Sequence, residues 1–258
     1  MKTIAIANQK GGIGKTTTAC ITASILKEKG YKVLIIDTDM QCNTTSNYNA
    51  ATEGVATIYD VIIAKDDERV DINEAIQHTE HGDIIASDRL LIEAEAVLSA
   101  DRLNGLFRFQ EALSKLSGYD FVIIDTNPVL NLMLYNVLIA VDYMIVPVTT
   151  DRFGLEGLSQ LSDTVLSVKS RYNRNLNILG LLIVKYKQRT SLGRNLKADL
   201  EGIATKMGTK LFETTIRESI KVQEAQALQI PLNKYAPYCT SEMDYESYVE
   251  ELLKGVNA

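Results

Sequence analysis

Short apolar runs alternate along the chain with stretches in which apolar residues recur every three or four positions. The runs are rich in Ile and Val, which is typical of strands buried on both faces of a parallel sheet. They are TIAIAN (3–8), KVLIID (32–37), DIIAS (83–87), DFVIID (120–125), YMIVPVT (143–149) and NILGLLIV (177–184). The amphipathic stretches between them predict helices at Thr16–Lys29, Arg102–Leu116, Leu155–Arg171 and Leu192–Lys206. We therefore expect an α/β fold, with a mostly parallel, twisted sheet flanked by helices on both faces.

Two further regions are less regular. In Ala50–Asp83 the pattern is weak, and IYDVIIA predicts a short helix followed by a polar connection. Near the carboxyl end, DYESYVEELLKG predicts a final helix that ends at Gly255, because glycine commonly stops a helix. No low-complexity linker separates these regions, so we expect residues 1–258 to form a single domain.

Composition adds the cellular setting to this picture. Hydrophobic residues make up 46% of the chain and there are only four prolines, which is enough for a sizeable core. Cys20, Cys42 and Cys239 are far apart and form no CxxC pair, so they are interpreted as reduced thiols. No apolar run approaches the ~20 residues of a membrane span, and a strand pattern directly follows Met1. We expect a cytoplasmic protein.

Charge is distributed unevenly along the chain. The net charge is −6, yet Val165–Lys221 contains 12 Lys and Arg against 4 Asp and Glu, whereas the remainder contains 15 against 29. Such a segment can form a local surface for an anionic partner, or it can consist of solvated helix faces. The charge pattern alone leaves both interpretations open.

The stretch QKGGIGKT, Gln9–Thr16, lies between the first predicted strand and the first predicted helix. In this context glycines let backbone N–H groups turn toward phosphate oxygens, and the helix N-terminus adds positive charge. Lys15 would bridge the β- and γ-phosphates, Thr16 would ligate Mg²⁺, and Thr17 would contact the α-phosphate. The alternative is a glycine-rich turn without a ligand. The candidate nucleotide-binding residues here are Lys10, Gly11, Gly12, Gly14, Lys15, Thr16 and Thr17.

Two predicted strands end in aspartates. VLIIDTD carries Asp37 and Asp39, and YDFVIID ends in Asp125. Carboxylates at the carboxyl ends of buried strands lie beside the phosphate loop in this architecture. Asp125 would hold Mg²⁺ through a water molecule, together with Thr16. For each aspartate the alternative is a helix cap or a turn residue.

The stretch KGGIGKTT, Lys10–Thr17, resembles the deviant Walker A motif of the ParA/MinD group of P-loop ATPases, and ParA/Soj-type partition ATPases in particular. The resemblance implies that Lys10 is the signature lysine, which reaches the phosphates bound by the partner subunit of an ATP-sandwich homodimer. It also implies that Lys10 and Lys15 act on the phosphates in catalysis, and that Asp39 orients or deprotonates the attacking water. Met40 and Asn127 stand where this family usually has proline.

The resemblance continues toward the carboxyl end. VPVTTDRFGLEGL and KYKQRTSL resemble family segments that follow later strands, although Lys187 replaces an acidic residue. TIRESIKVQEA resembles the segment that closes over the adenine, which makes Arg217 and Ser219 candidates for base contacts.

The resemblance implies a Mg²⁺-dependent ATPase with a slow basal rate that segregates DNA. Its ATP-bound dimer would bind nucleoid DNA without sequence preference and would leave after a ParB-like or other small DNA-binding activator stimulates hydrolysis. Contacts with DNA phosphates are expected from the basic segment. The candidate residues are Arg189, Arg194, Lys197, Arg217 and Lys221. A relative that positions a protein cargo on the nucleoid remains an open alternative.

Two relatives with other functions fit the sequence less well. A MinD-like membrane switch needs a basic amphipathic tail, whereas the tail from Met243 holds four acidic residues against Lys254. An iron-protein-like electron carrier needs cysteines placed to hold a cluster, and no suitable pair is evident.

Overall fold

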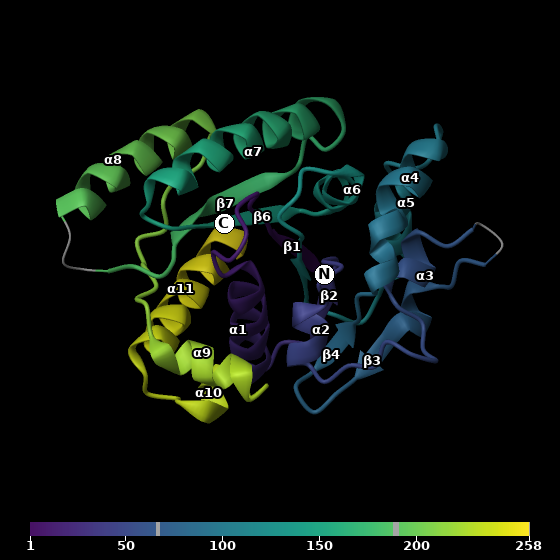
Figure 1. Ribbon diagram of the computed structural model, residues 1–258, viewed down its shortest axis with the longest axis horizontal. Coiled ribbons are helices and arrows are strands. Elements are labelled where there is room, and N and C mark those ends of the chain that lie inside the picture. Colours follow the sequence, from purple (N-terminus) through teal and green to yellow (C-terminus); the bar gives the residue numbers. More distant parts are fainter. Residues whose placement is uncertain (66–67, 188–190, 258) are drawn as a thin grey trace.

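The computed structural model describes residues 1–65, 68–187 and 191–257, and for 152–156 and 191–197 only the backbone. Seven strands form one sheet in the order β3-β4-β2-β5-β1-β6-β7 (Figure 1). Only β3 and β4 pair antiparallel; the other neighbours are parallel. The strands are β1 (Lys2–Ile6), β2 (Val33–Asp37), β3 (Ile76–His78), β4 (Asp83–Ile85), β5 (Phe121–Asp125), β6 (Tyr143–Val148) and β7 (Asn177–Ile183).

Helices cover both faces of this sheet (Figure 1). One face packs against α1 (Lys15–Glu28), α9 (Ile220–Ala227), α10 (Leu232–Tyr235) and α11 (Thr240–Asn257). The other packs against α3 (Ile58–Ile62), α4 (Ala94–Ala100), α5 (Arg108–Lys115), α6 (Leu132–Ala140), α7 (Arg152–Arg171) and α8 (Ser191–Lys206). The remaining short elements are α2 (Asn43–Asn47), η1 (Ile72–Ala75) and η2 (Arg89–Glu93).

Alternate strand residues enter the two cores. In β2, Leu34 and Ile36 belong to one buried cluster and Ile35 to the other, and all three are fully buried. Because side chains alternate across a strand, a sheet covered on both faces needs continuous apolar runs. This explains why the Ile- and Val-rich runs mark the strands, and the predicted α/β fold is confirmed.

The strand predictions match the structure better than the helix predictions. Each of the six predicted runs contains a strand. The helix expected at Arg102–Leu116 covers only Arg108–Lys115, because Asp101 accepts the Asn104 N–H and forms a turn. The predicted stop at Gly255 is wrong, since α11 continues to Asn257. Gly255 does not have the positive φ that would end a helix, and it packs against Leu179. The helix therefore continues through this residue.

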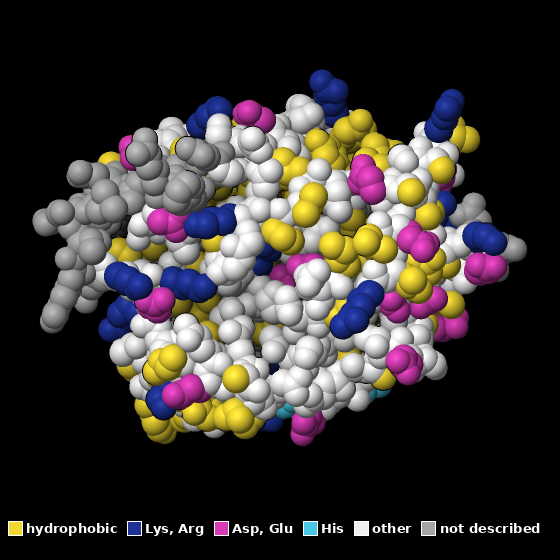
Figure 2. Space-filling view, viewed as in Figure 1, with side chains coloured by type: hydrophobic (Ala, Val, Ile, Leu, Met, Phe, Trp, Pro, Cys, Tyr) yellow, Lys and Arg dark blue, Asp and Glu magenta, His cyan; other side chains and the backbone are white. Residues whose placement is uncertain are grey.

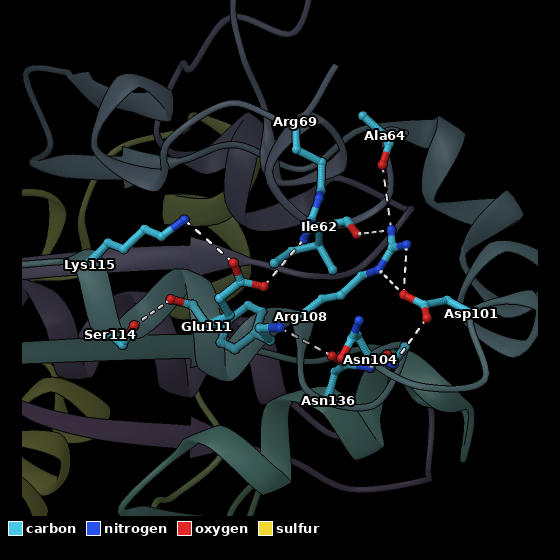
Figure 3. Close-up of polar contacts among 12 residues, drawn as sticks. Ile62, Ala64, Arg69, Asp101, Asn104, Arg108, Glu111, Ser114, Lys115 and Asn136 are labelled. Carbon is cyan, nitrogen blue, oxygen red and sulfur yellow. Dashed lines mark hydrogen bonds and ion pairs between the residues drawn. The ribbon is translucent and has the colours of Figure 1, made fainter. Parts of the chain in front are cut away.

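The weakly patterned region Ala50–Asp83 contains the predicted short helix, α3, but also η1 and the antiparallel edge strand β3. A buried Arg108 at the start of α5 fixes this region to the rest of the fold (Figure 3). Its guanidinium donates to the Asp101 carboxylate at 2.9 Å and to the Ile62 carbonyl at 3.1 Å. One cation therefore joins the ends of α3, α4 and α5.

Within the described part of the chain, no helix combines the length and the apolar character needed to cross a membrane.

Candidate functional site

The carboxyl ends of β1, β2 and β5 meet at one edge of the sheet. The register pairs Asp125 with Asp37 on β2 and with Ile6 on β1. The two predicted site aspartates, Asp125 and Asp39, therefore lie at this edge, since Asp39 follows Asp37 by two residues. Above it lies a cleft of about 760 Å³. The phosphate loop and α2 form one wall, and residues 216–219, α9 and Tyr245 form the other. This volume is within the range of small-molecule sites.

The phosphate loop has the conformation that its glycines permit. Gly12 and Gly14 have φ of 70° and 101°, a region that other residues rarely adopt. Gly14 directly precedes α1, whose first backbone N–H groups lack helical partners and face the loop. Lys15 is buried, and its Nζ donates to the Lys10 carbonyl at 3.2 Å. Burial lowers the pKa of Lys15, while Asp125 and Asp39 oppose this shift.

Thr16 and Asp125 lie together, as predicted for a metal site. Oδ2 of Asp125 accepts hydrogen bonds from the Thr16 hydroxyl at 2.7 Å and the Thr44 hydroxyl at 2.8 Å. Its Oδ1 is buried and has no hydrogen-bond partner among the described residues. Burial raises the pKa of Asp125 to about 6.

These groups fit a magnesium ion that is shared with a nucleotide. Mg²⁺ commonly binds one or two protein oxygens together with phosphates and water. The described residues contain no group of three or more His, Cys, Asp and Glu that would hold a metal unaided. A hydroxyl beside a carboxylate with an unused oxygen therefore suits Mg²⁺ when phosphates supply the remaining ligands.

The two aspartates after β2 differ in their surroundings. Asp37 is fully buried and accepts bonds from the Asp39 N–H and from both the N–H and the hydroxyl of Thr45, between 2.8 and 3.0 Å. Burial and the nearby Asp125 raise the pKa of Asp37 to about 7. Asp39 lines the cleft and is 8% exposed, and among the described groups its carboxylate accepts only the Gln41 N–H. Asp37 supports the loop, and Asp39 faces the cleft.

Lys10 is directed away from the loop to which it belongs. Its Nζ lies 2.6 and 2.7 Å from the two carboxylate oxygens of Asp151 and 3.3 Å from the Thr149 hydroxyl. In this chain, therefore, Lys10, the first lysine of the motif, is paired with a carboxylate, and Lys15 is the lysine beside Asp125.

Arg217 and Ser219, the residues predicted to contact the adenine base, both line the cleft. The Arg217 guanidinium donates to both carboxylate oxygens of Asp244, at 2.9 and 2.7 Å. The Ser219 hydroxyl caps α9 by accepting the Lys221 N–H at 3.2 Å. Across the cleft, Nε2 of Gln226 on α9 donates to the Thr17 hydroxyl at 2.8 Å.

Lys185 is a site residue that sequence reasoning missed. It follows β7, has a left-handed φ of 53°, and its Nζ donates to the Gly12 carbonyl at 2.6 Å. A non-glycine residue in this conformation is uncommon and often marks a functional position. The available signal was a lysine directly after an apolar run, at the sheet edge where ligands bind.

The predicted DNA-contacting residues are only partly described. Arg189 lies outside the described residues, as do the side chains of Arg194 and Lys197 on α8. Arg217 pairs with Asp244, and Lys221 pairs with Glu224 at 2.8 Å. Figure 2 shows Lys and Arg side chains gathered at the left, beside the region that Figure 1 labels α8 and α11.

Comparisons with known proteins agree with this geometry. The family model described as AAA domain matches residues 1–178. The chain is 32% identical over 257 residues to the chromosome partitioning protein ParA of Caulobacter vibrioides, covering 98% of this chain and 94% of that protein. It is 36% identical over 239 residues to the sporulation initiation inhibitor protein Soj of Bacillus subtilis, covering 92% of each.

Solved structures show the same fold. A plasmid partition protein from Borrelia burgdorferi is 29% identical, with 98% of both chains covered and a TM-score of 0.75. Cobyrinic acid a,c-diamide synthase from Mycobacterium smegmatis, solved with an ATP analogue and magnesium, is 26% identical with a TM-score of 0.85, covering 100% of this chain and 96% of that one. The latter protein holds a nucleotide and magnesium on a fold that this chain shares.

Proposed function

The chain belongs to the AAA domain family and, within it, to the ParA/Soj-type partition ATPases, and we propose that it segregates DNA as an ATP-dependent homodimer. In this proposal residues 1–258 act as one domain that binds ATP with Mg²⁺ and hydrolyses it slowly. The dimer binds nucleoid DNA in the cytoplasm without sequence preference. A small DNA-binding activator protein on the cargo stimulates hydrolysis and releases the dimer.

The arrangement around Asp125 is the observation that carries the ATPase proposal. Among the described residues its Oδ1 has no hydrogen-bond partner, and its Oδ2 accepts from the hydroxyl of Thr16, which lines the cleft together with the buried Lys15. Thr16 would hold Mg²⁺ directly and Asp125 would hold it through water, and the ion would supply positive charge at the phosphates. Lys15 and the glycine N–H groups would bind the phosphates from the other side.

In this proposal Asp39 acts on the attacking water. It lines the cleft and leaves most of its hydrogen-bonding capacity unused, whereas Asp37 is occupied by Thr45 and the loop. A carboxylate in this position would orient the water or accept its proton. Hydrolysis of ATP to ADP and phosphate needs no other protein base in this scheme.

Lys10 would complete the site of a second copy. Its pair with Asp151 is partly exposed, with side-chain exposures of 28% and 43%. Ion pairs in such positions stabilise a fold by about 0–1 kcal/mol. A triphosphate presented by a partner subunit offers Lys10 several charged oxygens, so exchange of Asp151 for that ligand is energetically accessible.

DNA binding would rest on the basic side of the molecule. Contacts from Arg194, Lys197 and Lys221 to phosphates are weak singly, and two subunits side by side double their number. Arg217 contributes its charge less directly, since Asp244 already accepts two of its hydrogen bonds. DNA affinity would then follow ATP-dependent dimerisation without a further conformational device.

Sedimentation of an Asp39→Ala variant with Mg²⁺ and ATP tests the dimer. We expect this variant to bind ATP and to sediment as a dimer, because it keeps the phosphate loop and Lys10. The matched double variant, Asp39→Ala with Lys10→Ala, should bind ATP and remain a monomer. If the first variant binds ATP and stays monomeric, the sandwich dimer is excluded.

Retention on DNA tests whether the basic residues of α8 contact DNA. Arg194→Glu with Lys197→Glu should abolish retention of the ATP-bound dimer on random-sequence DNA at low salt, and wild-type retention should fall steeply as salt rises. Lys254→Glu on α11 is the control with the same kind of charge change. If the wild-type protein, the double variant and Lys254→Glu are retained equally, α8 does not contact DNA.

A further inference from the structure

A second, smaller cavity lies beside the nucleotide cleft. It is enclosed by α1, α2, the connection between α9 and α10, and α11, and its volume is about 50 Å³. A cavity of this size has room for about three or four water-sized ligands. Thr17, Asn47 and Gln226 line both this cavity and the nucleotide cleft.

Glu242 lies in the first turn of α11 and lines this cavity. It is 1% exposed, and among the described residues neither of its carboxyl oxygens has a hydrogen-bond partner. The described residues also give it no ion pair. Burial, together with the neighbouring Glu246 and Glu28, raises the pKa of Glu242 to about 7. A buried carboxylate in this situation needs a compensating group.

The walls of the cavity do not supply a positive charge. Burial lowers the pKa of His81 below its usual value, so this imidazole is neutral at pH 7. The Cys20 thiol is also neutral, because burial raises its pKa to about 12. Lys27 and Lys234 lie near enough to His81 to lower its pKa further, but in the described structure neither pairs with Glu242. The N-terminus of α11 adds partial positive charge without donating a hydrogen bond to the carboxyl oxygens.

Neutral oxygens accompany Glu242 in the wall. Three lining amides each donate at least one N–H elsewhere: Asn47 to the Cys20 thiol, Gln226 to the Thr17 hydroxyl, and Gln229 to Ser46. No hydrogen bond between described residues uses their amide oxygens, which can therefore accept a ligand. A wall with one carboxylate and several neutral oxygens suits a monovalent cation, whereas divalent ions in proteins favour several carboxylates or an extensive water shell.

We propose that this cavity binds a weakly hydrated monovalent cation, potassium or ammonium, through the Glu242 carboxylate and the surrounding amide oxygens. The site is separate from the proposed magnesium position at Asp125, and its cation would neutralise the Glu242 carboxylate. Its connection to ATP binding rests on the proposed function: a bound cation would hold α9 and Gln226 against Thr17. The cation site itself does not depend on that function.

Thermal unfolding without nucleotide tests the site. The wild-type protein is compared in KCl, NH₄Cl, NaCl and tetramethylammonium chloride at equal ionic strength and pH 8, where Glu242 is mostly ionised. We expect the midpoint to rise by about 3 °C in the potassium or ammonium salt relative to tetramethylammonium. The comparison of the first two salts identifies which cation is preferred.

Two variants make the result specific. Glu242→Gln keeps the size of the side chain and should lose the difference between salts. Glu246→Gln, on the exposed side of the same helix, removes the same charge and should keep it. An equal midpoint in all salts for wild type, or a salt difference that persists in Glu242→Gln, would overturn the proposal. Because nucleotide is absent, a failure here leaves the ATPase proposal untouched, and a failed ATPase leaves this result standing.

A crystal soaked in a thallous salt gives the direct observation, since Tl⁺ replaces K⁺ and scatters anomalously. A peak beside Glu242 supports the site, and a well-diffracting soaked crystal without that peak excludes it.

Discussion

The two walls of the nucleotide cleft are built in different ways. The wall at the phosphate end comes from the ends of three adjacent strands and the loop between β1 and α1, so its residues are placed by local conformation and sheet register. The opposite wall is held by contacts between residues far apart in sequence. Gln226 and Thr17 are separated by 209 positions, and Lys185 and Gly12 by 173. We infer that the first wall carries the chemistry and the second adjusts how firmly the nucleotide is held.

Substitution of Asp39 should give the largest effect, since it removes the carboxylate that we propose acts on the attacking water. Asp39→Asn should lower the rate of phosphate release by about 10²–10⁴-fold while ATP still binds. The control is Asp37→Asn, which replaces an acceptor of the Thr45 bonds with a donor. It should lower the free energy of unfolding by about 1–3 kcal/mol, measured by urea titration. If Asp39→Asn releases phosphate at the wild-type rate, the inference that the phosphate wall carries the chemistry is contradicted.

Substitution of Lys185 should give an intermediate effect. Lys185→Met removes the ammonium that donates to the Gly12 carbonyl and keeps the length of the side chain. The dissociation constant of ATP, measured with a fluorescent analogue, should rise about three- to tenfold with a nearly unchanged rate at saturation. Lys187→Met, whose partner is Glu218, should leave both values as in wild type. A large fall in the saturated rate would instead assign Lys185 to the chemistry.

The smallest effect is expected at Gln226. Gln226→Ala removes one neutral, exposed hydrogen bond to Thr17, so ATP affinity should fall only about two- to threefold. Gln223 lines the cleft from the same helix, and Gln223→Ala serves as the matched control in equilibrium binding. If the two variants bind ATP equally well, the contact between α9 and Thr17 does not help to hold the nucleotide.

The same division explains how far the sequence could be interpreted. Six of the seven described strands and the phosphate loop were predictable, because apolar runs and glycine spacing determine local conformation. Asp39 and Asp125 were singled out because they follow two of these strands. Arg217 and Ser219 were placed by resemblance and do line the cleft. Their partners were not predictable, since the Asp244 and α9 contacts depend on how distant helices pack.

Other features also depended on tertiary structure. Lys185 resembles any lysine after a strand until its backbone conformation and its contact with Gly12 are known. Gly255 shows the opposite case, in which a residue that usually ends a helix is accommodated because α11 packs on β7 beside Leu179. Glu242 was not singled out in the sequence, because its burial shows only in the assembled fold.

The position of β1 between β5 and β6 has a consequence for synthesis of the protein. β1 leaves the ribosome before both of its neighbours, which are complete only after Phe121–Val148 have been translated. At ~5–20 residues per second, that delay is roughly 6–30 seconds. Throughout this time the nascent chain carries an unpaired apolar strand and an unformed phosphate loop. The growing polypeptide therefore cannot bind ATP until most of it has been made, and chaperones have that interval in which to shield β1.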